Sequence, residues 1–173
     1  MTTHPKINRK RRRLLHQVVT AAVATAAATQ VAAAPAATAP SAAAASRGKG
    51  GDDKPHKIVY QLNKADPEYI EHILNSVAAM LSKYPEEIAI AVVCFGPGIH
   101  LIARKPQRPI PEELRRRAKG QAEFYGVRYI ACGNTMKTLG WGPEAIEPFA
   151  TIEEVGAAAI MELHEAGYAY LAW

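Results

Sequence analysis

A near-continuous apolar run at residues 87–96, Glu-Ile-Ala-Ile-Ala-Val-Val-Cys-Phe-Gly, constrains the fold of this chain more than any other feature. The run has the length of a β-strand, but it lacks the alternation of a strand that has one face in water. Such strands are typical of parallel sheets that helices cover on both faces. We therefore expect residues 87–96 to form a central strand of an α/β domain.

Strand-like and helix-like segments alternate on both sides of this run. Further strands are expected at residues 57–62, 127–132 and 168–173, and helices within residues 65–85, 111–126 and 151–167. Alternation of this kind implies parallel pairing through right-handed crossovers. The sequence thus predicts one three-layer domain at residues 56–173, with a largely parallel sheet flanked by helices.

Residues at the helix ends support these boundaries. Asp66 is expected to cap the first helix, with Pro67 at its first position, and Gly126 is expected to end the second. Thr151 and Glu154 stand in the spacing of a capping box at the start of the last helix. Residues 133–150 are expected to form short helical pieces and turns.

The net charge of +5 belongs to the N-terminal segment. Residues 1–45 contain six of the 21 Lys and Arg residues and no Asp or Glu, which leaves 15 basic against 16 acidic residues in the rest of the chain. The cluster Arg115, Arg116, Arg117 and Lys119 is interpreted as one solvated helix face. A near-neutral domain without a basic stripe argues against a nucleic-acid partner.

Residues 1–45 have the pattern of an export signal. A basic stretch is followed by a mildly hydrophobic Ala/Val/Thr run and by small residues suited to cleavage near Ala45. Arg11 and Arg12, with Leu14 and Leu15 after one intervening residue, resemble a twin-arginine signal, and Sec export remains the alternative route. We expect a periplasmic protein with a linker at residues 46–55 and no stable membrane anchor once the signal is cleaved.

The two cysteines, Cys94 and Cys132, are the main candidates for chemistry. Cys132 ends an expected strand, and a helix beginning at Gly133 or Asn134 would direct its amide groups at the sulfur and lower the pKa of the thiol. A packed, inert Cys132 is the competing interpretation. Cys94 lies among apolar residues and is expected to be a core thiol, although export would also permit a Cys94–Cys132 disulfide.

Three further residues are placed near Cys132 by the expected topology. Asn134 and Thr135 are candidate caps or hydrogen-bond donors to a sulfur anion, and His100 could reach the site as a base or as a donor. No His or Cys spacing indicates a metal site. The Gly-Pro-Gly segment at residues 96–98 lacks the spacing of a phosphate-binding loop, so neither metal nor cofactor is expected.

Several segments together resemble the DsrE/DsrF-like family of small sulfur-relay proteins. The resemblance covers residues 56–173, and its most specific parts are Gly126-Val127, the run Ala131-Cys132-x-Asn134-Thr135-Met136, and the ending Gly167-Tyr168-Ala169-Tyr170. It implies a single α/β domain that assembles as a trimer or hexamer. It also implies that Cys132 matches the cysteine that carries a persulfide in the relay subunits.

The function expected from the residues and the resemblance is an exported sulfurtransferase or sulfur carrier. Cys132 would hold sulfane sulfur as a persulfide, Asn134, Thr135 and His100 would support it, and a second protein would donate or accept the sulfur. The alternative is a non-catalytic oligomeric binding module that holds a small ligand at the carboxyl edge of the sheet. A third hypothesis is redox chemistry through both cysteines.

Overall fold

The computed structural model describes residues 53–173 of this 173-residue chain. The expected signal peptide and most of the linker lie outside the described residues. The domain contains one five-stranded sheet in the order β4-β3-β2-β1-β5. Its strands are all parallel: β1 His56–Leu62, β2 Ile88–Cys94, β3 Arg128–Cys132, β4 Ala150–Glu153 and β5 Ala169–Leu171. The predicted fold class is confirmed.

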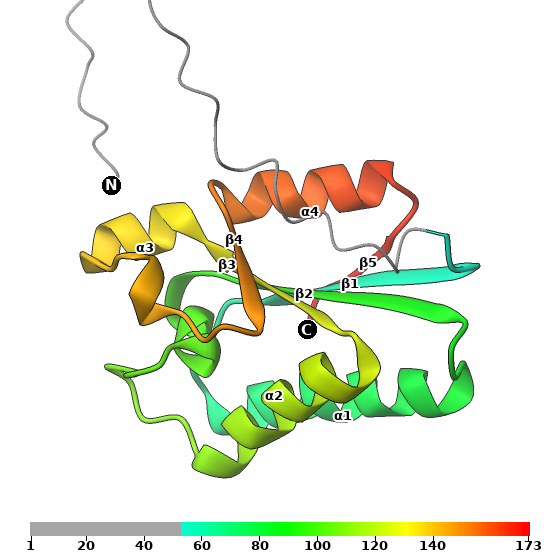
Figure 1. The fold of residues 1–173 in the computed structure, drawn as a ribbon, viewed down its shortest axis with the longest axis horizontal. Helices are drawn as coiled ribbons and strands as arrows, with labels where there is room; N and C mark the ends of the chain where they lie inside the picture. Colours follow the sequence, from blue (N-terminus) through cyan, green and yellow to red (C-terminus); the bar gives the residue numbers. More distant parts are fainter. Residues whose placement is uncertain (1–52) are drawn as a thin grey trace, which may run out of the picture. The chain divides into compact units, whose positions relative to one another are not determined.

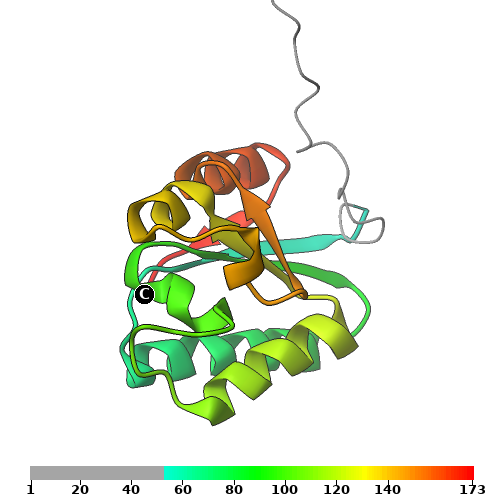
Figure 2. The ribbon, with the colours of Figure 1, turned by 60° about the vertical axis from the view of Figure 1, so that its left-hand side comes forward.

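The longer helices cover both faces of the sheet, as Figures 1 and 2 show. Helices α1 (Pro67–Lys83) and α2 (Glu112–Tyr125) lie on one face, and α4 (Gly156–Glu165) lies on the other. The chain steps from β1 to β4 in one direction and then returns across the sheet to β5. Because parallel crossovers are right-handed, this reversal requires α4 to pack on the opposite face.

Three shorter helices follow the carboxyl ends of β2 and β3. They are η2 (Gly96–Ile102), α3 (Gly133–Leu139) and η3 (Pro143–Ala145). Gly98 lets η2 lie against the end of β1, since a Cβ atom at this position would stand 2.2 Å from the carbonyl oxygen of Leu62. The Gly-Pro-Gly segment at residues 96–98 therefore serves to pack η2 against the end of β1. Between residues 53 and 173, none of the helices has the length and apolarity needed to span a bilayer.

Strand β2 divides the core into two clusters. Ile90, Val92 and Cys94 pack under α1 and α2, whereas Ala91 and Val93 pack under α4. All seven residues of β2 are buried, as expected of a strand covered on both faces. Because side chains alternate along a strand, the position of each cysteine in its strand determines the face of the sheet toward which its side chain points.

Two of the helix ends predicted from sequence are confirmed, and a third is wrong. Asp66 caps α1 by accepting a hydrogen bond from the Tyr69 N–H at 2.9 Å, and Gly126 ends α2 in the left-handed region. The capping box predicted for Thr151 and Glu154 is wrong. Thr151 lies in β4, and α4 begins at Gly156 without a side-chain cap. The β-branched pair Thr151-Ile152 favours the extended backbone here.

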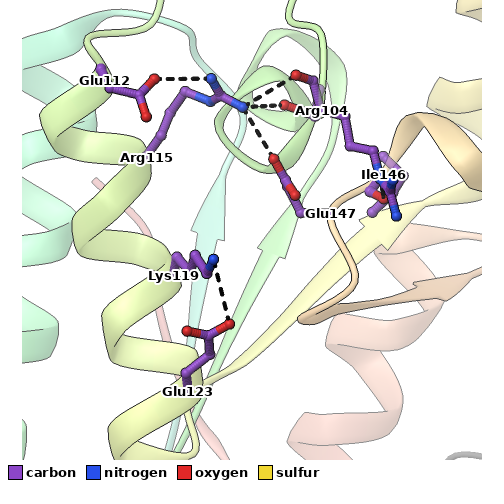
Figure 3. Close-up of polar contacts among 8 residues, drawn as sticks. Arg104, Glu112, Arg115, Lys119, Glu123, Ile146 and Glu147 are labelled. Carbon is purple, nitrogen blue, oxygen red and sulfur yellow. Dashed lines mark hydrogen bonds and ion pairs between the residues drawn. The ribbon is translucent and has the colours of Figure 1, made fainter.

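The basic cluster on α2 is only partly solvated, which corrects the interpretation from sequence. Arg115 has an ion pair with Glu112 and another with Glu147, both at 3.2 Å, and donates to the carbonyl oxygen of Ala103 at 2.9 Å (Figure 3). Arg104 in turn donates to the carbonyl oxygen of Ile146 at 3.2 Å. These contacts fasten the chain immediately after η2 to α2 and to the segment before β4.

A buried hydrogen-bond chain joins the sheet to both helices on that face. The Tyr129 hydroxyl donates to Oε1 of Gln121 at 2.8 Å, and Nε2 of Gln121 donates to the carbonyl oxygen of Leu74 at 2.9 Å. We predict that Tyr129→Phe lowers the free energy of unfolding by about 1–3 kcal/mol, because it leaves a buried amide oxygen unpaired. Urea denaturation of the wild-type and variant chains measures this difference.

Tyr170→Phe is the matched control, since Tyr170 is 44 % exposed and its hydroxyl bonds Gln61 at the surface. Its effect should stay within about 0.5 kcal/mol. Equal losses in the two variants would contradict a special role for the buried chain.

Candidate functional site

Cys132 lies at the ends of the neighbouring strands β3 and β4, and the connections that follow these two strands pack on opposite faces of the sheet. It is the last residue of β3 and pairs in register with Glu153 at the end of β4. The connection after β3 packs residues such as Met136 and Trp141 on the α1/α2 side, whereas the connection after β4 forms α4 on the other side. In parallel α/β sheets such a divergence opens a crevice beyond the strand ends, and ligand sites gather there.

The Cys132 sulfur lies among hydrogen-bond donors from the starts of α3 and α4. The N–H of Gly156 donates to Sγ at 3.2 Å. Burial, the largest influence, raises the pKa of Cys132. Hydrogen bonds from the backbone of Thr135, the backbone of Gly156, the Thr135 hydroxyl and the backbone of Asn134 together outweigh it, so the pKa lies below that of an ordinary cysteine. The arrangement therefore favours the thiolate.

Thr135 connects this sulfur to the beginning of η2. Its Oγ1 accepts a hydrogen bond from the Gly96 N–H at 3.0 Å, which leaves the hydroxyl proton available to Cys132. Asn134 contributes through its backbone only, and that N–H also donates to the carbonyl oxygen of Glu154 at 3.0 Å. Of the two neighbours predicted from sequence, Thr135 is thus the one whose side chain acts on the sulfur.

Gly156 allows this close approach. A Cβ atom at this position would stand 3.0 Å from Cβ and 3.3 Å from Sγ of Cys132. A larger residue would therefore need Cys132 or the start of α4 to shift by a few tenths of an ångström. Glycine allows the start of α4 to lie this close to the cysteine without such a shift.

Cys94 is buried on the opposite face of the sheet from Cys132. It packs in the cluster under α1 and α2, where burial raises the pKa of its thiol well above the ordinary value. Both cysteines are free. Strands β2 and β3 are neighbours, but Cys94 pairs in register with Ala131, so the side chain of Cys132, one residue further, points to the other face. The structure therefore contains no Cys94–Cys132 disulfide.

His100 is buried in η2, with an exposed fraction of 2 %. Its Nδ1 accepts a hydrogen bond from the Gln107 N–H at 3.3 Å, and its ring meets Trp141 edge-on at 5.1 Å. Burial, and then the nearby charge of Arg108, lower the pKa of His100, so the ring is neutral at pH 7. A neutral ring with Nδ1 as acceptor carries its proton on Nε2, which makes it a donor.

Two adjoining hollows open at the carboxyl edge beside these residues. The smaller, here called the threonine cavity, holds about 280 Å³ and is lined by Gly96, Pro97, His100, Arg108, Thr135, Thr138 and Leu139. The larger, here called the proline cleft, holds about 800 Å³ and is lined by Lys64, Ala65, Asp66, Pro67, Pro97, Arg108, Pro109, Ile110 and Pro111.

Within residues 53–173, no cluster of His, Cys, Asp and Glu is arranged to hold a metal ion.

Two residues described here, Gly156 and Arg108, were not among the candidates from sequence. Gly156 was hidden inside an expected helix that in fact begins there. Arg108 lies in a Pro-rich segment without periodicity, and only the fold brings it next to His100. The sequence offered one indication of this helix start, which is that Gly156 lies between the β-branched Val155 and an alanine-rich run.

We predict that the hydroxyl of Thr135 accelerates alkylation of Cys132. Loss of a hydrogen bond to a charged sulfur costs about 1.5 kcal/mol, so Thr135→Val should slow carboxamidomethylation at pH 7 by about tenfold and shift the rate profile to higher pH. Rates measured between pH 5 and 10 by peptide mass spectrometry test this. Cys94 should react only after denaturation.

Thr138→Val is the control, because Thr138 lines the same cavity while its hydroxyl donates to the carbonyl oxygen of Asn134 at 3.0 Å. Thr138→Val should leave the pH–rate profile of Cys132 alkylation unchanged. Identical profiles for wild type and Thr135→Val would refute the assigned role of the hydroxyl.

The fold has relatives among solved structures. One is described as a protein of unknown function, MTH1491, from Methanobacterium thermoautotrophicum. It superposes with a TM-score of 0.61 at 18 % sequence identity, and the match covers 68 % of this chain and 99 % of that one. At this identity the likeness concerns the fold alone. No curated protein sequence matches the chain significantly.

A family model covers the whole of the α/β domain. It is that of the DsrE/DsrF-like family, and it matches residues 56–173, the range over which the sequence itself resembled that family. The match includes β3, the cysteine at its end and the glycine that begins α4. The chain belongs to the DsrE/DsrF-like family.

Proposed function

We propose that this protein is a sulfur carrier in which Cys132 receives sulfane sulfur as a persulfide and passes it to an acceptor thiol. The observation that carries the proposal is the contact of the Cys132 sulfur with the Gly156 N–H at 3.2 Å, supported by the backbone and hydroxyl of Thr135. These donors stabilise a thiolate, which is the nucleophilic form of cysteine.

The transfer needs no oxidant. The Cys132 thiolate attacks the outer sulfur of a donor persulfide, R–S–SH, and a new S–S bond forms at Sγ. The S–S bond of the donor breaks, its electron pair leaves with RS⁻, and Cys132 holds –S–SH. Attack by an acceptor thiolate on that outer sulfur repeats the same exchange and returns Cys132 as a thiolate.

The arrangement also suits the loaded state. A persulfide that loses its proton is an anion, and the donors that lower the pKa of Cys132 can stabilise negative charge on the added sulfur as well. Only 6 % of Cys132 is exposed, so the loaded sulfur would be sheltered from reductants in solution. A carrier must keep its cargo long enough to deliver it, and this burial serves that need.

A second candidate function is a binding module without sulfur chemistry. The low exposure of Cys132 and the size of the proline cleft favour it, since a cleft of about 800 Å³ lies within the range of small-molecule sites. In this case Cys132 would be a packed thiol. The two functions differ in whether a covalent adduct forms.

We predict that inorganic polysulfide raises the intact mass of the protein by about 32 Da per sulfur atom. Dithiothreitol should reverse the gain. Cys132→Ser should abolish it, whereas Cys94→Ala should retain it, because Cys94 is fully buried on the other face of the sheet. Alanine avoids placing a hydroxyl among apolar residues. The absence of any adduct on wild type would favour the binding module.

Homo-oligomeric assembly, as a trimer or hexamer, is part of this proposal. Several large apolar side chains of the described residues are exposed, among them Phe124 at 81 % and Tyr125 at 62 % near the end of α2. Phe124 and Tyr125 are neighbours in the sequence, and exposed apolar side chains that gather on one surface are typical of a surface that a second chain covers. A partner protein that donates or accepts sulfur belongs to the same proposal.

Export to the periplasm is also proposed, on the sequence of residues 1–45 alone. We predict that replacing Arg11 and Arg12 together by Lys prevents export of the full chain, because the twin-arginine route requires the arginines and not merely their charge. Fractionation of bacterial cells measures the processed protein in the periplasm. Continued export of the variant would indicate the Sec route, and a wild-type chain retained in the cytoplasm would contradict export.

A further inference from the structure

The threonine cavity offers a ligand two donor groups that no other contact uses. Four polar side chains line it, and none is a carboxylate: His100, Arg108, Thr135 and Thr138. The Thr138 hydroxyl donates to the carbonyl oxygen of Asn134, and Oγ1 of Thr135 is occupied by the Gly96 N–H. The donor groups that remain for a ligand are the imidazole of His100 and the guanidinium of Arg108.

His100 presents one fixed N–H to this cavity. The ring is 2 % exposed, and its Nδ1 accepts a hydrogen bond from the Gln107 N–H at 3.3 Å. The neutral ring therefore carries its proton on Nε2, which has no hydrogen-bond partner within residues 53–173. Trp141 meets the ring edge-on at 5.1 Å. The donor is thus oriented before any ligand arrives, and a preorganised donor loses little entropy on binding.

Arg108 supplies the positive charge. Arg104 and Arg115 have guanidinium groups held by carbonyl or carboxylate oxygens, as Figure 3 shows, whereas in the described part of the chain no hydrogen bond or ion pair holds that of Arg108. Arg108 lines the proline cleft as well as the threonine cavity. Its guanidinium is therefore available to a ligand that extends from one hollow into the other.

The charge and the donors of the threonine cavity match a carboxylate. A guanidinium presents parallel N–H groups that fit the two oxygens of a carboxylate, and His100 adds a third N–H. Arg108 is the one charged side chain that lines this cavity, so a single negative charge balances it. A dianion such as phosphate would leave half of its charge without a partner.

The proline cleft provides an apolar wall for the rest of such a ligand. Four prolines and Ile110 line it, and Pro97 is shared with the threonine cavity. Its other charged groups, Lys64 and Asp66, are of opposite sign, and Asp66 already uses Oδ1 to cap α1. Beyond Arg108 the cleft thus has no net charge, which suits an uncharged, apolar body.

This ligand is not a substrate of Cys132. The cysteine lines neither hollow, and the side chain of Thr135 lies between its sulfur and the threonine cavity. The inference therefore concerns a site separate from the thiol, and it does not depend on sulfur transfer.

We propose that the two hollows together bind an organic monocarboxylic acid with an apolar body. The carboxylate lies in the threonine cavity, where it accepts hydrogen bonds from Arg108 and from Nε2 of His100. The apolar body lies in the proline cleft, against the proline rings and Ile110.

The test titrates three probes into the full chain by calorimetry. Phenylbutyrate has both the carboxylate and an apolar body, phenylbutanol lacks the charge, and acetate lacks the body. Phenylbutyrate should bind about tenfold more tightly than phenylbutanol, because the alcohol loses the charge-assisted contacts, and acetate should bind more weakly than either. Equal affinity for the acid and the alcohol, or no binding of phenylbutyrate, overturns the proposal.

Variants assign the contacts. Arg108→Gln should raise the Kd of phenylbutyrate about tenfold and leave that of phenylbutanol unchanged. His100→Phe removes the second donor while keeping a ring of similar size, and should raise the Kd of the acid several-fold. Arg116→Gln is the control, because Arg116 is an exposed arginine that lines neither hollow. An unchanged affinity of Arg108→Gln for the acid contradicts the site.

A measurement on the wild-type chain covers the case in which His100→Phe fails to fold. In two-dimensional amide NMR spectra, phenylbutyrate should shift the signals of Ala65, Gly96 and Arg108, and leave those of Ala159 and Leu163, which pack under α4, in place. Shifts confined to other residues overturn the proposal. Cys132→Ser should bind phenylbutyrate as wild type does, so this result and sulfur loading on Cys132 succeed or fail independently.

Discussion

The contact between the Gly156 N–H and the sulfur of Cys132 is the constraint on which the rest of the site depends. It requires β3 and β4 to be neighbours, with Cys132 opposite Glu153, so that the chain leaving β4 turns across the end of β3. It also requires α4 to lie on the opposite face from α1 and α2, which the return from β4 to β5 imposes. The order of the strands therefore determines that the Gly156 N–H meets the sulfur of Cys132.

The two cysteines show that environment, and not residue type, decides in which direction the pKa of a thiol moves. Cys94 and Cys132 both end strands of the same sheet, and neither is appreciably exposed. Burial raises the pKa of Cys94 without compensation, whereas helix-start amides and the Thr135 hydroxyl outweigh burial at Cys132. Because side chains alternate along a strand, a shift of one position in register separates a thiol whose pKa is raised from one whose pKa is lowered.

The sequence alone predicted the fold class, the two helices under the sheet and the place of Cys132, because these depend on periodicity and caps that act locally. It missed β4 (Ala150–Glu153), because Thr151 in this strand has a capping-box spacing to Glu154, which the extended backbone overrides. Arg108 and Gly156 were missed for a different reason. Both residues contribute through contacts with residues that are distant in the sequence, and no local sequence pattern indicates such contacts.

Fixed anchors explain how an irregular segment can contribute to a site. Residues 103–111 contain no regular element, yet Arg115 holds the carbonyl oxygen of Ala103, and the Arg104 N–H donates to the carbonyl oxygen of Ala145 at 2.8 Å. The Gln107 N–H then meets the ring of His100. With its start fastened to α2 and its middle to η2, the segment places Arg108 in the lining of the threonine cavity. Arg115, one residue of the basic cluster on α2, thus helps to hold this segment in place.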